Sequence, residues 1–247
     1  MDGGLKITQS LCSNSLTTWE HRGISDNLVV VFSGVGPVQS ETPKYEFARS
    51  ASANGRHNVL FLSDPNRTWL NGSGLIEQIQ VQIERFRDRC NAKRVIAVGH
   101  SMGGFSALII PSFTKVDEVL AFAPQRSIDP RIVPDEHRWM QYRREIGQIL
   151  IPKVDDFLIS FPRYTVIHGR HGREAPQRES FPRPVNLRHY VLPHTHHNVP
   201  QRLKQAKGLD KVVGFAIDGR PRSMRRTLQN EFGAKLLPHQ NSQPNKG

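Results

Sequence analysis

The clearest chemical signal in the sequence is a serine between two glycines, in the run Gly-His-Ser-Met-Gly at 99–103. An apolar, β-branched segment, 94–98, precedes this run, and an apolar segment of helical character, 103–110, follows it. A Gly-x-Ser-x-Gly turn between a buried strand and a helix lifts the serine hydroxyl clear of the sheet. Glycines are needed there because side chains would collide with the neighbouring strand and helix. Ser101 is therefore the predicted nucleophile, and a glycine-rich turn with an incidental serine is the alternative.

A serine hydroxyl needs a base to take its proton, and three histidines lie close together at 194, 196 and 197. They follow 187–192, the last predicted core strand, at the sheet edge where Ser101 is expected. We favour His197 because it directly precedes a predicted helix, while His194 and His196 remain alternatives. The His-x-His-His spacing would also suit a metal, but no carboxylate or cysteine accompanies it, so we predict no metal site. Solvated loop histidines are the third interpretation.

The base must in turn be oriented by a carboxylate, which should follow the predicted strand 164–168 in the chain order serine, acid, histidine. The loop after that strand contains Glu174 and no aspartate. A glutamate can hold the imidazole N–H and stabilise the imidazolium as an aspartate does, so Glu174 is the predicted acid. Asp129, after the preceding strand, is the alternative, and surface pairing of Glu174 with arginines is another.

Acyl transfer also needs two N–H donors for the oxyanion. The first should be Met102, the residue after the nucleophile. The second should come from the loop after the strand 28–32, which reads Ser-Gly-Val-Gly at 33–36. Glycines allow the backbone to approach a carbonyl closely, so Gly34 or Val35 is the predicted second donor. A plain glycine turn is the competing interpretation.

The remaining sequence alternates strands with helices, which predicts a mostly parallel sheet covered by helices on both faces. A long connection at 126–162 follows the strand 118–122 and is expected to form a small cap over the site. We predict a single domain over 1–237 and a disordered tail at 238–247. The eight predicted strands are 5–10, 16–21, 28–32, 58–62, 94–98, 118–122, 164–168 and 187–192, and the predicted helices are 42–53, 75–90, 103–110, 135–150, 154–159, 199–207, 210–217 and 221–232.

Composition limits the class of protein. The 247 residues are 37% hydrophobic without a long apolar run, which predicts no membrane span. Only two cysteines are present and no signal peptide is visible at the N-terminus, so we expect a cytoplasmic protein. The net charge of +12 favours acidic partners, such as phosphorylated or carboxylated substrates. No nucleic-acid-binding motif accompanies it, so a solvated basic surface is favoured over a nucleic-acid site.

Over 5–217 the chain resembles the α/β-hydrolases. Four segments are also similar to a bacterial branch of that superfamily that is sometimes encoded near glycan-assembly enzymes: 31–36, 60–69, 99–105 and 121–125. The resemblance implies the α/β-hydrolase fold, a serine mechanism without a cofactor, and a small-molecule or glycan-linked acyl substrate. The sequence departs from the family pattern at the acid, where Glu174 stands in place of an aspartate.

Three further residues lie at the carboxyl ends of predicted strands and could line the substrate pocket. Arg67 could clamp a carboxylate or phosphate, which would make the substrate anionic. Trp69 and Gln125 could contact the substrate beside it. The alternative for the first segment is that Asp64 pairs with Arg67 to brace the loop while Trp69 packs in the core.

The sequence therefore predicts a serine hydrolase that cleaves a carboxylic ester or a thioester through an acyl-enzyme. An acyltransferase would use the same triad with an alcohol or sugar in place of water. A hydrolase-fold protein that binds without catalysis, such as a scaffold in glycan assembly, is an alternative of another class. Nucleic-acid binding through the basic segment after Arg220 is a further one.

Overall fold

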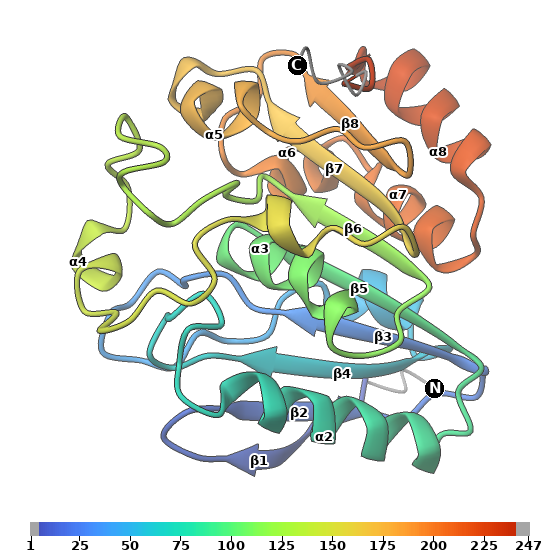
Figure 1. The fold of residues 1–247 in the computed structure, drawn as a ribbon. Coiled ribbons are helices and arrows are strands. Elements are labelled where there is room, and N and C mark those ends of the chain that lie inside the picture. Colours follow the sequence, from blue (N-terminus) through green and yellow to red (C-terminus); the bar gives the residue numbers. More distant parts are fainter. Residues whose placement is uncertain (1–4, 241–247) are drawn as a thin grey trace.

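One sheet of nine strands organises the computed structural model, which describes residues 5–240 (Figure 1). The strand order is β1-β2-β4-β3-β5-β6-β7-β8-β9. The neighbours from β4 to β8 in this order pair in parallel, while β1, β2 and β9 attach in antiparallel pairs. The strands are β1 Thr8–Cys12, β2 Thr17–His21, β3 Asn27–Phe32, β4 Asn58–Ser63, β5 Arg94–His100, β6 Glu118–Phe122, β7 Arg163–Gly169, β8 Leu187–Leu192 and β9 Lys235–Leu236.

Helices cover both faces of this sheet because alternate strand residues point to opposite sides. In β3, Val30 packs in a core with α2 and α3, whereas Val29 and Val31 pack in a second core with α6 and α7. The helices are α1 Ala48–Ser52, α2 Leu75–Arg89, α3 Met102–Ile109, α4 Met140–Arg143, α5 Ala175–Glu179, α6 Val199–Gln205, α7 Leu209–Ile217 and α8 Pro221–Arg226.

The predicted mostly parallel sheet with helices on both faces is confirmed, and a ninth strand extends it. This strand, β9, has two residues, too few to give a periodic signal. The last described residues follow it: Arg183 donates from Nε to the Pro238 carbonyl oxygen and accepts from Gln240 at its own carbonyl. Residues 241–247 of the tail predicted to be disordered lie outside the described part of the chain.

Several predicted helices are shorter in the structure. The helix expected at 42–53 begins only at Ala48, after Phe47 in left-handed backbone geometry. The one expected at 135–150 is reduced to α4, since Arg143 donates to carbonyl oxygens of Ile128 and Glu136 and holds irregular backbone around it. Residues 154–157 form a 3₁₀ turn rather than a helix to 159, and α8 is followed by a π-turn at 227–231.

The connection at 126–162 is tied together at its neck and runs past the carboxyl ends of the strands (Figure 1). Ser127 and Lys153 form an isolated antiparallel bridge, and Arg126 forms an ion pair with Asp155 at 2.7 Å. The residues between these contacts therefore form an excursion with closed ends, which we call the 126–162 segment. It carries α4 and lies at the end of the sheet where Ser101 is found.

Backbone crowding explains the two glycines around Ser101. A Cβ on Gly99 would lie 2.1 Å from the Gly103 carbonyl oxygen, and one on Gly103 would lie 2.0 Å from the Phe32 carbonyl oxygen. These separations are far below van der Waals contact, so β3, β5 and α3 can approach this closely only with glycine at both positions. Ser101 itself has φ 57° and ψ −121°, a strained geometry for a residue with a side chain.

Two helical glycines allow a direct test of this packing. Gly103→Ala should lower the free energy of unfolding by about 3 kcal/mol or more, because β3 backbone must move to accept the methyl group. Gly214→Ala is the matched control, since a Cβ there meets nothing within 4 Å and alanine favours the helix α7 by about 0.5–1 kcal/mol. Urea unfolding of the two variants measures both changes, and equal stability would contradict the packing argument.

Candidate active site

Ser101 lies at the turn between β5 and α3, where its Oγ accepts a hydrogen bond from Gln125 Nε2 at 3.2 Å. Gln125 follows β6, the neighbouring strand, and its Oε1 accepts from Trp69 Nε1, also at 3.2 Å. All three side chains are buried. Two of the residues predicted to line the substrate pocket are thus joined to the predicted nucleophile by hydrogen bonds.

His197 and Glu174 meet through a hydrogen bond between Nδ1 and Oε2 at 3.1 Å. An ionised carboxylate accepts, so Nδ1 carries the proton and Nε2 is left as the acceptor a base requires. Nε2 is buried and has no hydrogen-bond partner among residues 5–240. His197 therefore has Nδ1 on Glu174 and a buried Nε2 that bonds to no described residue, Ser101 included.

His100 connects this loop to the serine turn. Its ring centroid lies 4.9 Å from that of His197, and its Nε2 donates to the His197 carbonyl oxygen at 3.1 Å. Burial, followed by the nearby His197, lowers the pKa of His100 to about 3, so the ring is neutral. The residue just before Ser101 thereby holds the backbone of the predicted base against the turn.

Glu174 remains ionised in its buried position. Burial is the largest single influence and raises its pKa, but the hydrogen bond from His197 and the positive charges around it together lower the pKa to about 2. The residue ends a 3₁₀ turn, Gly172–Glu174, directly after β7, as the chain order of the triad requires. A glutamate thus takes the place expected for an aspartate.

Arg138 and Glu136 complete this cluster, and neither is among the site residues predicted from the sequence. Arg138 donates from Nη1 to Glu174 Oε1 at 2.6 Å and from Nη2 to Glu136 Oε2 at 2.5 Å. Its Nη1 also lies 2.9 Å from His197 Nδ1. Both residues come from the 126–162 segment, whose lack of periodicity leaves no sequence signal for where its side chains lie.

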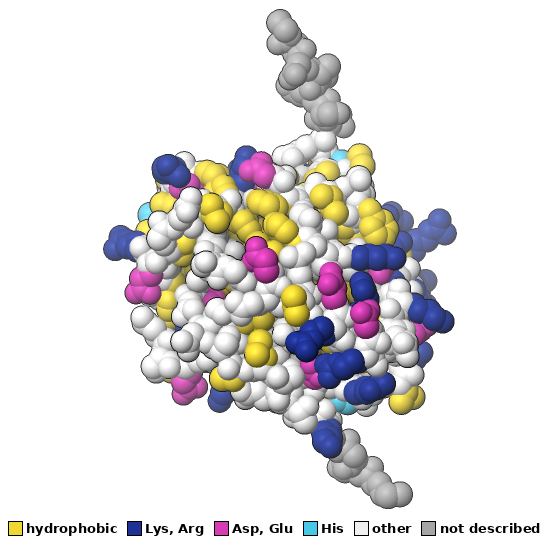
Figure 2. Space-filling view, turned by 60° about the horizontal axis from the view of Figure 1, so that its bottom comes forward, with side chains coloured by type: hydrophobic (Ala, Val, Ile, Leu, Met, Phe, Trp, Pro, Cys, Tyr) yellow, Lys and Arg dark blue, Asp and Glu magenta, His cyan; other side chains and the backbone are white. Residues whose placement is uncertain are grey.

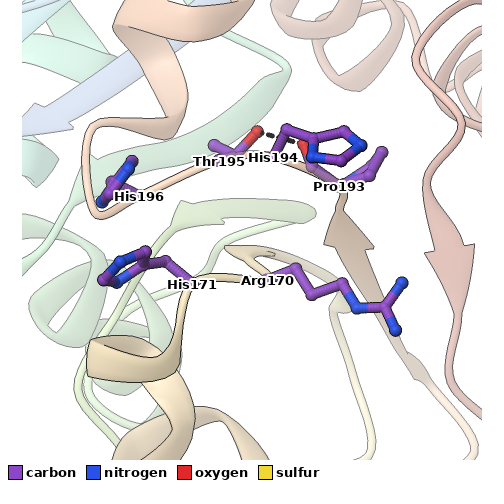
Figure 3. Close-up of a pocket in the computed structure, with 6 residues that line it drawn as sticks. All are labelled: Arg170, His171, Pro193, His194, Thr195 and His196. Atoms are coloured by element: carbon purple, nitrogen blue, oxygen red, sulfur yellow. Dashed lines mark hydrogen bonds between the residues drawn. The ribbon is translucent and has the colours of Figure 1, made fainter.

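The other two candidate histidines, His194 and His196, lie beside a different set of residues, which Figure 3 draws. His196 is exposed and its ring stacks on that of His171, with centroids 3.9 Å apart. The His194 side chain lies at the Pro193 end of the same loop, on the side away from His171. Together with Arg170 these residues border a cavity of about 490 Å³. Neither ring has a carboxylate partner among the described residues, in contrast to His197.

Asp129, the alternative acid, is engaged elsewhere. It forms an ion pair with Arg131 at 2.6 Å, and the hydrogen bond from Arg131 lowers the pKa of Asp129. Its other carboxylate contacts are to Arg131 as well. Within residues 5–240 the carboxylate next to His197 is Glu174.

The predicted oxyanion donors differ in whether their backbone N–H already bonds to an acceptor in the described chain. Gly34 N–H donates to Glu46 Oε2 at 3.3 Å, so it is occupied. The N–H groups of Val35 and Met102 have no acceptor within the described chain. Glu46 is enclosed enough that burial raises its pKa to about 7. Of the two residues predicted for the second donor, Val35 is the one whose N–H is unoccupied.

Arg67 braces a loop, and four of its five N–H donors bond to backbone carbonyl oxygens. Its side chain is buried, and Nε donates to the Val35 carbonyl oxygen at 2.8 Å while Nη1 and Nη2 donate to further carbonyl oxygens, those of Pro65, Val38 and Glu41. Asp64 bonds to Thr68 rather than to Arg67. The expected anion clamp at Arg67 is therefore replaced by support for the backbone that carries Val35.

A cavity of about 1060 Å³ is bordered by His100, by the start of α1 and by α6. Glu46, Asn198 and Lys204 are among the residues that border it.

The charge on the surface is mixed: on the face drawn in Figure 2, Lys and Arg side chains gather toward one side and alternate there with Asp and Glu. This face offers no continuous basic surface.

Two kinds of feature are absent from residues 5–240. No group of three or more His, Cys, Asp or Glu side chains among residues 5–240 could hold a metal ion. Within the same range, no helix combines the length and the apolar character that crossing a bilayer requires.

Comparisons with solved structures place this architecture in a known class. Brefeldin A esterase, a bacterial homologue of human hormone-sensitive lipase, aligns with TM-score 0.58 and 15% identity over 88% of this chain and 77% of its own. The capsule O-acetyltransferase of Neisseria meningitidis serogroup A gives 0.55 and 13% over 85% and 96%. Est1E from Butyrivibrio proteoclasticus gives 0.53 and 14% over 84% and 98%.

No family model and no curated protein matches the sequence. The structural neighbours include esterases, an enol-lactonase and an O-acetyltransferase, and all share one fold. The chain has the α/β-hydrolase fold, as its resemblance to that superfamily implied.

A buried histidine pair lies beneath the site. His168 at the end of β7 donates from Nε2 to the Pro124 carbonyl oxygen at 2.9 Å, and its Nδ1 lies 2.8 Å from His189 Nε2. Burial lowers the pKa of His168 to about 4 and also lowers that of His189 well below 6.5. Both rings are therefore neutral, and His189 donates to His168.

This pair should make stability depend on pH. A histidine whose pKa is lowered by folding stabilises the folded state above about pH 6.5, and that stability is lost as pH falls toward 4. The slope is about 1.4 kcal/mol per pH unit for each group. His189→Gln keeps an N–H for His168 but does not titrate, so the free energy of unfolding should fall less steeply between pH 6.5 and 4. Urea unfolding across that range measures the slope; an unchanged slope would contradict the assignment.

Proposed function

We propose that the protein is a serine hydrolase that cleaves a carboxylic ester or a thioester. The observation that carries the proposal is the Glu174–His197 hydrogen bond on a loop held by His100 against the strained turn of Ser101. The close packing of β3, β5 and α3 strains the backbone at Ser101, and strained residues of this kind cluster at functional sites. Nucleophile, base and acid come from the strand ends and order that the α/β-hydrolase fold uses.

In the proposed reaction His197 Nε2 takes the hydroxyl proton as Ser101 Oγ attacks the carbonyl carbon. The N–H groups of Met102 and Val35 stabilise the tetrahedral oxyanion, and Glu174 stabilises the imidazolium. The carbon–oxygen or carbon–sulfur bond then breaks, and the alcohol or thiol leaves with the proton from His197. Water, deprotonated by His197, attacks the acyl-enzyme and releases the acid and free Ser101. No cofactor takes part in these steps.

The substrate we propose is a small or glycan-linked acyl compound. Gln125 and Trp69 are the proposed contacts close to the reacting carbonyl, since Gln125 already bonds to Ser101 Oγ. We do not propose Arg67 as an anion contact, because four of its five N–H donors bond to backbone carbonyl oxygens of the loop. We place the activity in the cytoplasm because Cys12 and Cys90 are both free thiols in the structure.

Acyl transfer to an alcohol or sugar is the second candidate. The likeness to a capsule O-acetyltransferase favours it, since that protein shares this fold over 85% of the chain. Hydrolysis and transfer use the same acyl-enzyme, so product analysis with sugar acceptors decides between them. The carboxylate at His197 argues against a protein that only binds, because such a protein has no need of an oriented base.

Ser101→Ala should abolish covalent labelling by a fluorophosphonate probe, in which the serine oxygen displaces fluoride from phosphorus. Ser112→Ala is a suitable control, since its hydroxyl donates to the Phe157 carbonyl oxygen outside the site. It should label at the rate of the unmodified protein. Mass spectrometry of the labelled protein measures the result, and persistent labelling of the Ser101→Ala variant would refute the assigned nucleophile.

The choice among the three histidines can be tested on one loop. His197→Ala should lower kcat/KM for a chromogenic ester by about 10³-fold or more, because the serine then lacks its base. His196→Ala removes an exposed ring that stacks on His171 and should change kcat/KM less than threefold. Steady-state kinetics of both variants gives the comparison. The opposite order of effects would transfer the role of base to His196.

A further inference from the structure

The guanidinium of Arg138, from the 126–162 segment, bonds to the carboxylate of Glu174, the proposed acid. We propose that Arg138 is a positioning residue that fixes the Glu174 carboxylate for His197. This inference rests on the proposed function and adds a residue to its machinery. It assigns the 126–162 segment a part in the chemistry as well as a covering position.

The geometry divides the Glu174 carboxylate between two partners. Arg138 Nη1 bonds to Oε1 at 2.6 Å, which leaves Oε2 for His197 Nδ1 at 3.1 Å. A glutamate has one more rotatable bond than an aspartate, so a single hydrogen bond leaves its carboxylate more freedom. The guanidinium removes that freedom because its planar fork fixes the direction of the bond.

Glu136 fixes the guanidinium in turn. It receives two bonds from Arg138, from Nε at 2.9 Å and from Nη2 at 2.5 Å, in a bidentate arrangement. Glu136 is 3% exposed and Glu174 is 2% exposed, so the solvent screens these pairs poorly. Arg143 braces the same backbone by donating to the Glu136 carbonyl oxygen.

The charges around His197 balance when the imidazolium forms. Two carboxylates and one guanidinium give the resting cluster a charge of −1, which becomes zero when His197 takes the proton. Burial keeps the neighbouring His100 and His168 neutral by lowering their pKa values. Two more cations, Arg178 and Arg143, face the cluster from α5 and the 126–162 segment and donate to backbone carbonyls.

Arg138 also lies 2.9 Å from His197 Nδ1, so its charge opposes the imidazolium directly. Arg138 thus acts on His197 in two ways, by orienting the Glu174 carboxylate and by its own positive charge. Orientation of the carboxylate needs the planar fork, whereas repulsion of the imidazolium needs only a positive charge at that place. Two substitutions therefore separate them: Arg138→Lys keeps the charge without the fork, and Arg138→Gln removes both.

The test is the rate of fluorophosphonate labelling of Ser101 as a function of pH. Arg138→Gln should label about 100-fold more slowly at its optimum, since a small displacement of the acid misaligns the base. Its acid limb should also move to higher pH, because loss of the cation favours protonated His197. Arg138→Lys should be slowed in the same direction while its acid limb stays in place.

The matched control is Arg126→Gln. Arg126 belongs to the same segment, bonds to the carboxylate of Asp155 through Nε and Nη2, and is 22% exposed, against 24% for Arg138. It should label within twofold of the unmodified protein, with an unmoved acid limb. Thermal unfolding of all variants shows whether each one is folded at the temperature of the assay.

The outcomes separate this inference from the proposed function. Labelling of Arg138→Gln at the rate and pH dependence of Arg126→Gln would overturn the role of Arg138. A slower rate with an unmoved acid limb in Arg138→Gln would also overturn it, because a merely structural role predicts that result. If Arg138→Gln is unfolded, labelling of Arg138→Lys at the rate of the unmodified protein would overturn the role of Arg138. Failure of the proposed function is different: the unmodified protein would then show no labelling at Ser101.

Discussion

The close approach of three backbone segments at 99–103 is the constraint on which the site depends. Atoms of β3, β5 and α3 lie so near one another that a methyl group at Gly99 or Gly103 would overlap a carbonyl oxygen. This contact forces Ser101 into its strained backbone geometry and leaves the Met102 N–H unpaired at the start of α3. It also brings the loop after β3, with Val35, to the same edge of the sheet. The proposed nucleophile and oxyanion donors thus follow from one packing arrangement.

The proposed base and acid depend on a different kind of contact. His197 and Glu174 lie on loops after β8 and β7, and polar bonds rather than apolar packing hold them. Each bond in this set involves a buried group whose loss of partner would be costly, so the loops are specified despite their lack of regular structure. Arg138 and Glu136 extend the same principle to the 126–162 segment. In this network the Glu174 and Glu136 carboxylates are both bonded by Arg138, while the buried His197 Nε2 has no partner among the described residues.

The sheet and the strained turn at Ser101 could be predicted from the sequence because both are local. Runs such as 28–32 and 94–98 are apolar and β-branched throughout, which indicates buried parallel strands, and the glycines of the turn stand within five residues of each other. The 126–162 segment could not be predicted because its backbone is fixed by distant side chains, as Arg143 shows by bonding to Ile128 and Glu136. For the same reason Arg138 left no signal, and Arg67 seemed free to bind an anion. An arginine's role depends on which carbonyl or carboxylate the fold brings to it.

Glu174, in the loop after β7, shows what the structure adds to the sequence. Sequence alone marks Glu174 as a departure from the expected aspartate, and that departure weakens the case for a triad. The structure shows a longer side chain with a second partner, so that one oxygen is anchored and the other faces His197. The added methylene and the added arginine are consistent with each other, because a longer acid reaches further and needs more restraint. In the proposed triad the third member is better described as an ion pair than as a single carboxylate.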